Sequence, residues 1–130
     1  MALTGTVNIS WSVNGADNVR CVVTKSQDAE VSIEDLAVTQ PVTDKAYTIA
    51  IDVSALELIV IMCTKDATLE TNSAGSPADT ITLKAEEPYI WWKNAPWVNK
   101  LTTDVTAFYL TVAGTGTFDF HVAALQDPTP

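Results

Sequence analysis

The feature that most constrains this fold is a two-residue period of apolar side chains that recurs along the chain. Residues 7–13 alternate strictly between apolar and polar side chains, and the same period returns at residues 46–53, 104–112 and 117–123. This alternation is typical of half-buried strands, because successive side chains of a strand point to opposite faces of its sheet. No long amphipathic helix interrupts the pattern. The sequence therefore predicts an all-β protein.

The chain is predicted to open with a β-hairpin. Four apolar residues share one face of its first strand: Val7, Ile9, Trp11 and Val13. Asn14-Gly15 follows directly, and this dipeptide favours the positive φ angles of a two-residue hairpin turn. The partner strand is expected at residues 18–25, with Val19, Cys21 and Val23 facing one way.

Two further segments are less regular. Residues 56–63 are apolar on both faces, which predicts a central strand that is covered on both sides. In residues 26–44, Ser32-Ile33-Glu34-Asp35 resembles a helix capping box. Pro41 and several β-branched residues argue against a helix there, so we expect a short strand followed by a loop.

Turn-forming residues separate the remaining strands. Residues 71–77 are rich in Ser, Asn, Gly and Pro and predict an exposed loop. Strands are expected at residues 79–83 and, after Pro88, at residues 89–93. The last strand places three apolar residues on one face: Phe118, Phe120 and Val122.

Eight to ten short strands with turns between them predict an antiparallel β-sandwich, either jelly-roll or immunoglobulin-like. The period does not fix the strand order. A length of 130 residues suits one domain, which we place at residues 1–125. Residues 126–130 are expected to form a tail, because the prolines in Asp127-Pro128-Thr129-Pro130 cannot donate to a continuous ladder.

The charge balance excludes some classes of partner. Seven basic residues against sixteen acidic ones give a net charge of −9. Binding to nucleic acid or to an anionic membrane needs a basic face, which this chain cannot assemble. The acidic residues do not follow the spacing of a linear calcium loop. They are interpreted as a solvated surface rather than as a metal site.

The sequence offers no catalytic or metal-binding motif that we can defend. His121 is the only histidine and lies on the polar face of the last predicted strand, with no nucleophile motif to join it. Two isolated cysteines and one histidine do not make a zinc site. No pair of carboxylates can be identified for glycoside hydrolysis. We therefore expect a protein that is not an enzyme and that needs no cofactor or metal.

The two cysteines both lie in apolar, strand-like runs. Cys21 falls within residues 19–23 and Cys63 ends residues 58–63. Two buried, reduced thiols are the favoured interpretation, because free cysteine behaves as a small apolar residue. A disulfide between neighbouring strands remains open if the fold brings the two residues within about 6 Å.

An aromatic cluster is the sharpest local feature. Tyr89, Trp91, Trp92 and Trp97 fall within nine residues. On a strand, Tyr89 and Trp91 share a face while Trp92 points the opposite way. These rings could pack as core, anchor a protein–protein interface, or stack against sugar rings. For an interface we select Tyr89, Trp92 and Trp97 as candidate contact residues, with Trp92 and Trp97 first.

The C-terminal half resembles the small all-β virion proteins of tailed bacteriophages, including head decoration or cement proteins. The likeness lies in residues 79–88, 104–110 and 116–125: a strand, a Pro-initiated aromatic strand, a loop and a Gly-centred hairpin. It covers about half of the chain and includes no diagnostic motif. Such proteins are acidic, carry no catalytic residues and sit on the outer capsid surface, often as trimers.

The resemblance implies a structural role: binding the outside of a phage head and stabilising the contacts between capsomers. The implied partners are the major capsid protein and further copies of the chain, with a trimer favoured. The alternatives are a carbohydrate-binding β-sandwich module and a minor tail or neck component. Residues 1–6 show no signal segment and no apolar run reaches 18 residues. We therefore expect synthesis in the host cytoplasm and a final place in the virion.

Overall fold

The computed structural model describes residues 3–27 and 29–127, with the side chains of residues 11, 13 and 16–18 outside that description. The described residues form ten strands and one short 3₁₀ helix. The strands are β1 (Leu3–Val13), β2 (Ala16–Gln27), β3 (Ala29–Thr39), β4 (Val42–Ile51), β5 (Leu56–Cys63), β6 (Ala67–Thr71), β7 (Thr80–Leu83), β8 (Tyr89–Trp92), β9 (Val105–Val112) and β10 (Thr117–Gln126). The 3₁₀ helix is η1 (Val53–Ala55).

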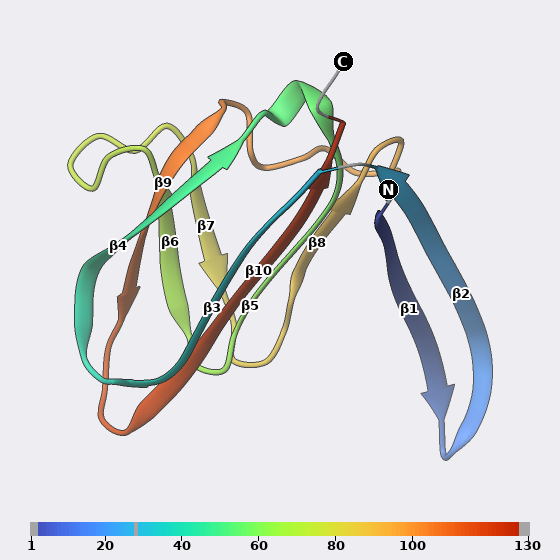
Figure 1. The fold of residues 1–130 in the computed structure, drawn as a ribbon. Coiled ribbons are helices and arrows are strands. Elements are labelled where there is room, and N and C mark those ends of the chain that lie inside the picture. The colour runs from blue at the N-terminus through green and yellow to red at the C-terminus, as the bar shows by residue number, and fades with distance from the viewer. Residues whose placement is uncertain (1–2, 28, 128–130) are drawn as a thin grey trace.

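Eight of the strands form two four-stranded antiparallel sheets that pack against each other (Figure 1). The first sheet has the order β3-β10-β5-β8 and the second the order β4-β9-β6-β7. The chain passes from one of these sheets to the other at almost every connection, and among these eight strands only β6 and β7 are consecutive neighbours in one sheet. This order is that of a jelly roll. The predicted β-sandwich is confirmed, and the jelly-roll connectivity is the one of the two alternatives that the structure shows.

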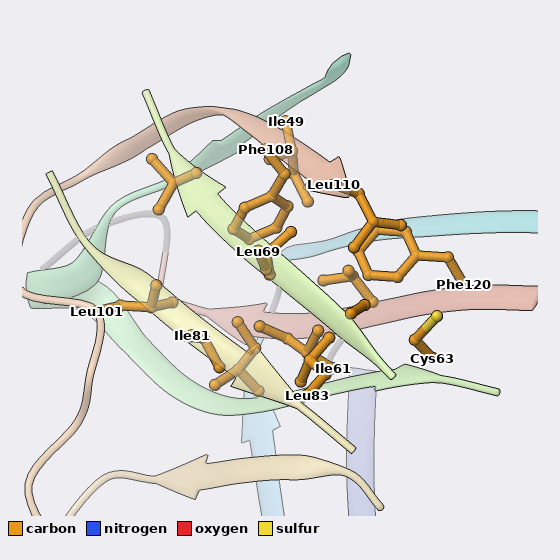
Figure 2. Packing of buried hydrophobic residues seen from close by; sticks show 14 of the residues in the cluster. Ile49, Ile61, Cys63, Leu69, Ile81, Leu83, Leu101, Phe108, Leu110 and Phe120 are labelled. Carbon is orange, nitrogen blue, oxygen red and sulfur yellow. The ribbon is translucent and has the colours of Figure 1, made fainter. Parts of the chain in front are cut away.

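The core fills the space between the two sheets. Its largest fully buried rings are Phe108 of β9 and Phe118 and Phe120 of β10. Figure 2 shows Phe108 and Phe120 packed among aliphatic side chains from both sheets. The predicted inward face of the last strand is therefore confirmed, because apolar residues at every second position meet the facing sheet.

The prediction of a short strand and a loop at residues 26–44 is wrong. β3 continues to Thr39, and β4 begins at Val42 directly after the cis bond between Gln40 and Pro41. The alternation of β3 is interrupted at residues 35–38, where its register with β10 shifts and Ala37 has a φ of 53°, and this interruption hides the continuation of the strand. Pro41 lies in the turn between the strands, where it blocks no ladder. The five-residue strand β6 also falls outside the segments that the sequence predicts as strands.

The first two strands form a separate hairpin (Figure 1). Val13 pairs with Ala16, so the turn consists of Asn14 and Gly15 alone. Both turn residues have positive φ angles, 54° and 81°, as a two-residue turn of this type requires. The predicted opening hairpin is confirmed. β1 and β2 pair only with each other, and the hairpin diverges from the sandwich toward its turn.

Two boundary findings complete the fold. β10 includes Gln126, one residue beyond the predicted end of the domain, and the Gln126 side chain accepts a hydrogen bond from the Asp52 backbone at 2.9 Å. Residues 128–130 of the predicted tail lie outside the described residues. Within the described ranges, no helix is long and apolar enough to cross a membrane.

Candidate protein-binding surface

The sheet β3-β10-β5-β8 presents an unusually apolar face away from the core, which we call the outer face. Side chains that are paired across antiparallel strands lie on the same face. Leu58 pairs with Leu125 and Trp92, and Val60 pairs with Ala123 and Ile90. Outward positions of a two-layer sandwich are expected to be polar. The apolar side chains here instead indicate a surface that something covers.

The base of the hairpin covers one end of the outer face. Val7 is only 9% exposed and forms a small buried cluster with Leu58 and Leu125, against which Trp92 packs. Gly5 allows the close approach, since a Cβ at that position would lie 2.8 Å from Leu58 Cδ2. A groove of about 120 Å³ remains between the hairpin and the sheet, lined by Gly5, Val7, Val60 and their neighbours.

Beyond Val7 the same side of the hairpin is exposed. Ile9 pairs with Cys21, so both belong to the face that carries Val7, and Val19 lies further toward the turn on that face. Ile9 is 36% exposed and Val19 53% exposed, and Cys21 is exposed as well. We call Ile9, Val19 and Cys21 the distal hairpin face. It continues the packed surface at Val7 onto a part of the hairpin that stands clear of the sandwich.

The structure corrects the interpretation of Cys21 as a buried thiol. Cys21 is exposed, because the hairpin strand that carries it packs on the sandwich only at its base. Cys63 is fully buried as expected, and burial raises the pKa of its thiol. Both cysteines are free, so the open alternative of a disulfide between them is not the state of this structure.

Two of the three candidate contact residues adjoin the outer face. The Trp97 ring meets Trp92 edge-on, with 4.7 Å between ring centroids and an interplanar angle of 76°. Trp97 Nε1 donates to the Ile90 carbonyl at 3.1 Å and keeps the ring in place. Trp97 is nevertheless 43% exposed, and its neighbour Val98 is largely exposed. Trp92 therefore connects the cluster at Val7 with the exposed loop that follows β8.

The third candidate, Tyr89, points into the sandwich. It shares the inward face of β8 with Trp91, as predicted, and packs against the main core. Its hydroxyl donates to Asn99 Oδ1 and accepts from the Lys100 backbone at 2.8 Å. Burial raises the pKa of Tyr89, although the bond from Lys100 opposes that shift. These contacts give Tyr89 a role in ordering the loop after β8, which the sequence pattern did not indicate.

Several acidic side chains accept hydrogen bonds from loops and are not simply exposed to solvent. Asp79 accepts from the Thr102 backbone and hydroxyl at 2.8 and 2.7 Å, and Asp119 accepts from the Ala37 backbone at 2.8 Å. They therefore satisfy loop backbone groups that would otherwise lack partners. Among the described residues, no group of three or more His, Cys, Asp and Glu side chains could hold a metal ion. His121 lies on the outer face opposite Met62 and Glu34, on the side of the strand that the sequence predicted.

Comparison with known proteins does not assign this chain to a family. No family model and no curated protein matches it. Among solved structures, the chain is similar to one described as Bacillus endospore appendages that form a family of disulfide-linked pili. The two share 14% identity over 93% of this chain and 99% of that chain, with a TM-score of 0.33. A likeness at that level carries no argument about function.

Proposed function

We propose that this chain is a structural protein that binds other protein surfaces in a multi-subunit particle. The specific form of the proposal is a decoration or cement protein that binds the outside of a phage head and stabilises the contacts between capsomers. Its partners are then the major capsid protein and further copies of the chain. It works by contact alone and transforms no substrate.

One observation carries this proposal: large apolar side chains are exposed in two groups, one on the hairpin and one in the loop after β8. They occupy the distal hairpin face and the loop at Trp97 and Val98, and the cluster at Trp92 lies between these two regions. Scattered apolar residues are normal on a protein surface, whereas a connected group of them marks an interaction site. Trp is also among the residues that contribute most to protein interfaces.

The aromatic geometry favours a protein partner over a sugar. Two rings that form a flat platform for a sugar must expose parallel faces. Trp92 and Trp97 instead meet at 76°, with Trp92 half-buried against the hairpin cluster. The edge of one ring therefore covers the other, and only Trp97 offers a broad exposed surface.

The experiment is sedimentation of the native source lysate through a density gradient, with the chain located by immunoblotting. A particle-bound protein runs with species far heavier than any soluble oligomer. A protein that stays at the top of the gradient contradicts the proposal. Oligosaccharide titration followed by tryptophan fluorescence then becomes the next assay, because carbohydrate binding changes fluorescence without changing mass.

Trp97→Ala tests the proposed anchor in the same gradient. Truncation of a tryptophan that anchors an interface as a hot spot costs about 2 kcal/mol or more, so we expect about a thirtyfold loss of particle affinity. Leu36→Ala is the matched control, since Leu36 is 54% exposed on the edge strand β3, away from this loop. Equal particle binding by both variants, each with an unchanged melting temperature, would remove Trp97 from the interface.

A further inference from the structure

The distal hairpin face and the outer face are both apolar, and among the described residues each continues the surface that packs at Val7 without a partner of its own. The hairpin already packs on the sheet through Val7, which fits against Leu58 and Leu125. Further along the hairpin, Ile9 and Val19 are apolar as well but are exposed. Along the outer face the apolar positions also continue, past the hairpin base, to Val60 and Met62 of β5.

The hairpin does not close this contact within its own chain, since its distal hairpin face is exposed. β1 has 11 residues, and at about 3.3 Å per residue it extends roughly 36 Å. Its base is fixed at Gly5 and Val7, where the backbone approaches Leu58 too closely for a side chain at Gly5. The distal hairpin face lies between Val7 and the turn, on the part of the hairpin that diverges from the sandwich (Figure 1), so another molecule can reach it.

Charge identifies the molecule that suits this face. The hairpin, residues 3–27, contains Arg20 and Lys25 against Asp17, a net charge of +1, which leaves −10 for the rest of the chain. Glu30 and Glu34 lie on the outer face, opposite Leu125 and His121. Two sandwiches repel each other, whereas a hairpin and a sandwich have opposite net charges. Arg20 lies on the same side of β2 as Val22, opposite Val19, and Lys25 lies at the hairpin base, so this attraction acts at long range and not through charge pairs at the contact.

We propose that the distal hairpin face of one copy docks on the outer face of a second copy, beside Val60 and Met62. This inference rests on the proposed function and deepens it by naming the partner of the hairpin. Each copy then supplies one arm and one receiving surface, so the contact is head-to-tail. Contacts of that kind close into a ring or continue as a filament.

The first test uses the purified full-length chain in sedimentation equilibrium, at concentrations up to about 1 mM, because a contact this small is expected to be weak. The average mass should rise above 14.0 kDa as concentration increases. Val19→Thr should weaken the association about tenfold, because it replaces an apolar contact group by a polar isostere. A constant mass of 14.0 kDa over the whole range overturns the proposal.

Val22→Thr is a matched control within the same strand. Val22 is 55% exposed against 53% for Val19, and pairs with Asn8 on the opposite face of the hairpin. It should associate like the wild type. Equal weakening by both variants overturns the proposal, because the effect would then not depend on the face. Ile9→Thr repeats the test from β1 if Val19→Thr shifts the melting temperature.

Mixing two variants tests the receiving surface and the direction of the contact. Met62→Lys places a cation on the outer face and should prevent docking there. In an equimolar mixture with Val19→Thr, the intact arm of one variant meets the intact surface of the other, and a mass of one pair should return. A mixture that gains no mass overturns the head-to-tail contact. These assays contain no particle, so their failure and a failure of particle binding in the gradient are separate results.

Discussion

At the scale of single residues, Tyr47 shows how this sandwich holds a polar group at the margin of its core. Its ring packs at 5.1 Å from that of Phe120, while its hydroxyl donates to Asp35 Oδ2 at 2.7 Å. Lys45 Nζ lies 3.6 Å from the same carboxylate oxygen. Burial, followed by the bond to Asp35, raises the pKa of Tyr47 well above its ordinary value.

The raised pKa predicts a loss of stability in alkali. Above pH 10, which is about the pKa of tyrosine in an unfolded chain, the unfolded state releases a proton that the folded state keeps. Stability from this group is therefore complete below pH 10 and falls as the pH rises further. Melting temperature against pH should decline less steeply for Tyr47→Phe than for the wild type.

Tyr47→Phe also has an expected cost at neutral pH. Loss of the hydrogen bond to Asp35 should reduce the free energy of unfolding by about 1 kcal/mol. Tyr89 and Cys63 also have raised pKa values, so the melting temperature of the variant should still fall in alkali, but by less than that of the wild type. Parallel declines in the two proteins would contradict the assignment to Tyr47.

The sequence predicts residue orientation well where a strand is buried on one face. Phe118 and His121 lie on the sides of β10 that the alternation indicates. The pattern fails for Cys21, because alternation shows which residues share a face but not whether another layer covers that face. Tyr89 is a similar case: its bonds to the loop after β8 depend on a chain path that spacing does not encode.

At the scale of elements, the hairpin depends on the backbone of its turn. Gly15 has a φ of 81°, and a Cβ there would meet nothing within 4 Å. Gly15→Ala therefore isolates the backbone cost of a left-handed conformation, about 1–2 kcal/mol. Hydrogen exchange should accelerate in the amides of β1 and β2 and stay unchanged in β10.

Gly75→Ala is the control for that prediction. A Cβ at Gly75 also meets nothing within 4 Å, but no left-handed φ is required there. It should leave exchange in the hairpin at the wild-type rate. Equal exchange in both variants would mean that the turn does not limit hairpin stability.

The predictions of elements succeed where neighbouring residues alone determine the structure and fail where the structure depends on the strands that lie alongside. Asn14-Gly15 fixes its turn through backbone preference alone. β3 was expected to be short, but it continues to Thr39 through a register shift opposite Phe118 and Phe120 of β10, which the apolar pattern does not show. β6 is recognisable only once β9 and β7 are seen to flank it.

At the scale of the whole molecule, the order of strands determines what the surface offers. The jelly-roll order places β5, apolar on both faces, inside the first sheet, so one of its faces must point outward. Half of that outward face receives the hairpin base, and the rest remains apolar. The sequence predicts the sandwich and the internal position of β5, but its expectation that β5 is covered on both sides is only partly right, because the hairpin packs on the outward face at Leu58 while Val60 and Met62 stay partly exposed. The separation of the hairpin from the sheets depends on contacts that no periodicity records.

The net charge of −9 affects how whole molecules approach one another. Sandwich bodies with such a charge repel one another, and the repulsion is screened by salt over about 10 Å at 0.1 M. In the contact that we propose, one nearly neutral arm on a strongly acidic body would let copies meet through the arm while their bodies stay apart. Contact between neighbours is thereby restricted to a defined surface.

The most direct test of the central claim is the alkylation rate of Cys21, because this thiol lies on the distal hairpin face itself. Iodoacetamide is added to dilute protein and to assembled protein, with fully buried Cys63 as the internal reference. The account predicts that Cys21 reacts rapidly in dilute solution and slows in proportion to the assembled fraction, while Cys63 stays slow in both. An equal rate for Cys21 in the two states would contradict the claim that another protein covers this face.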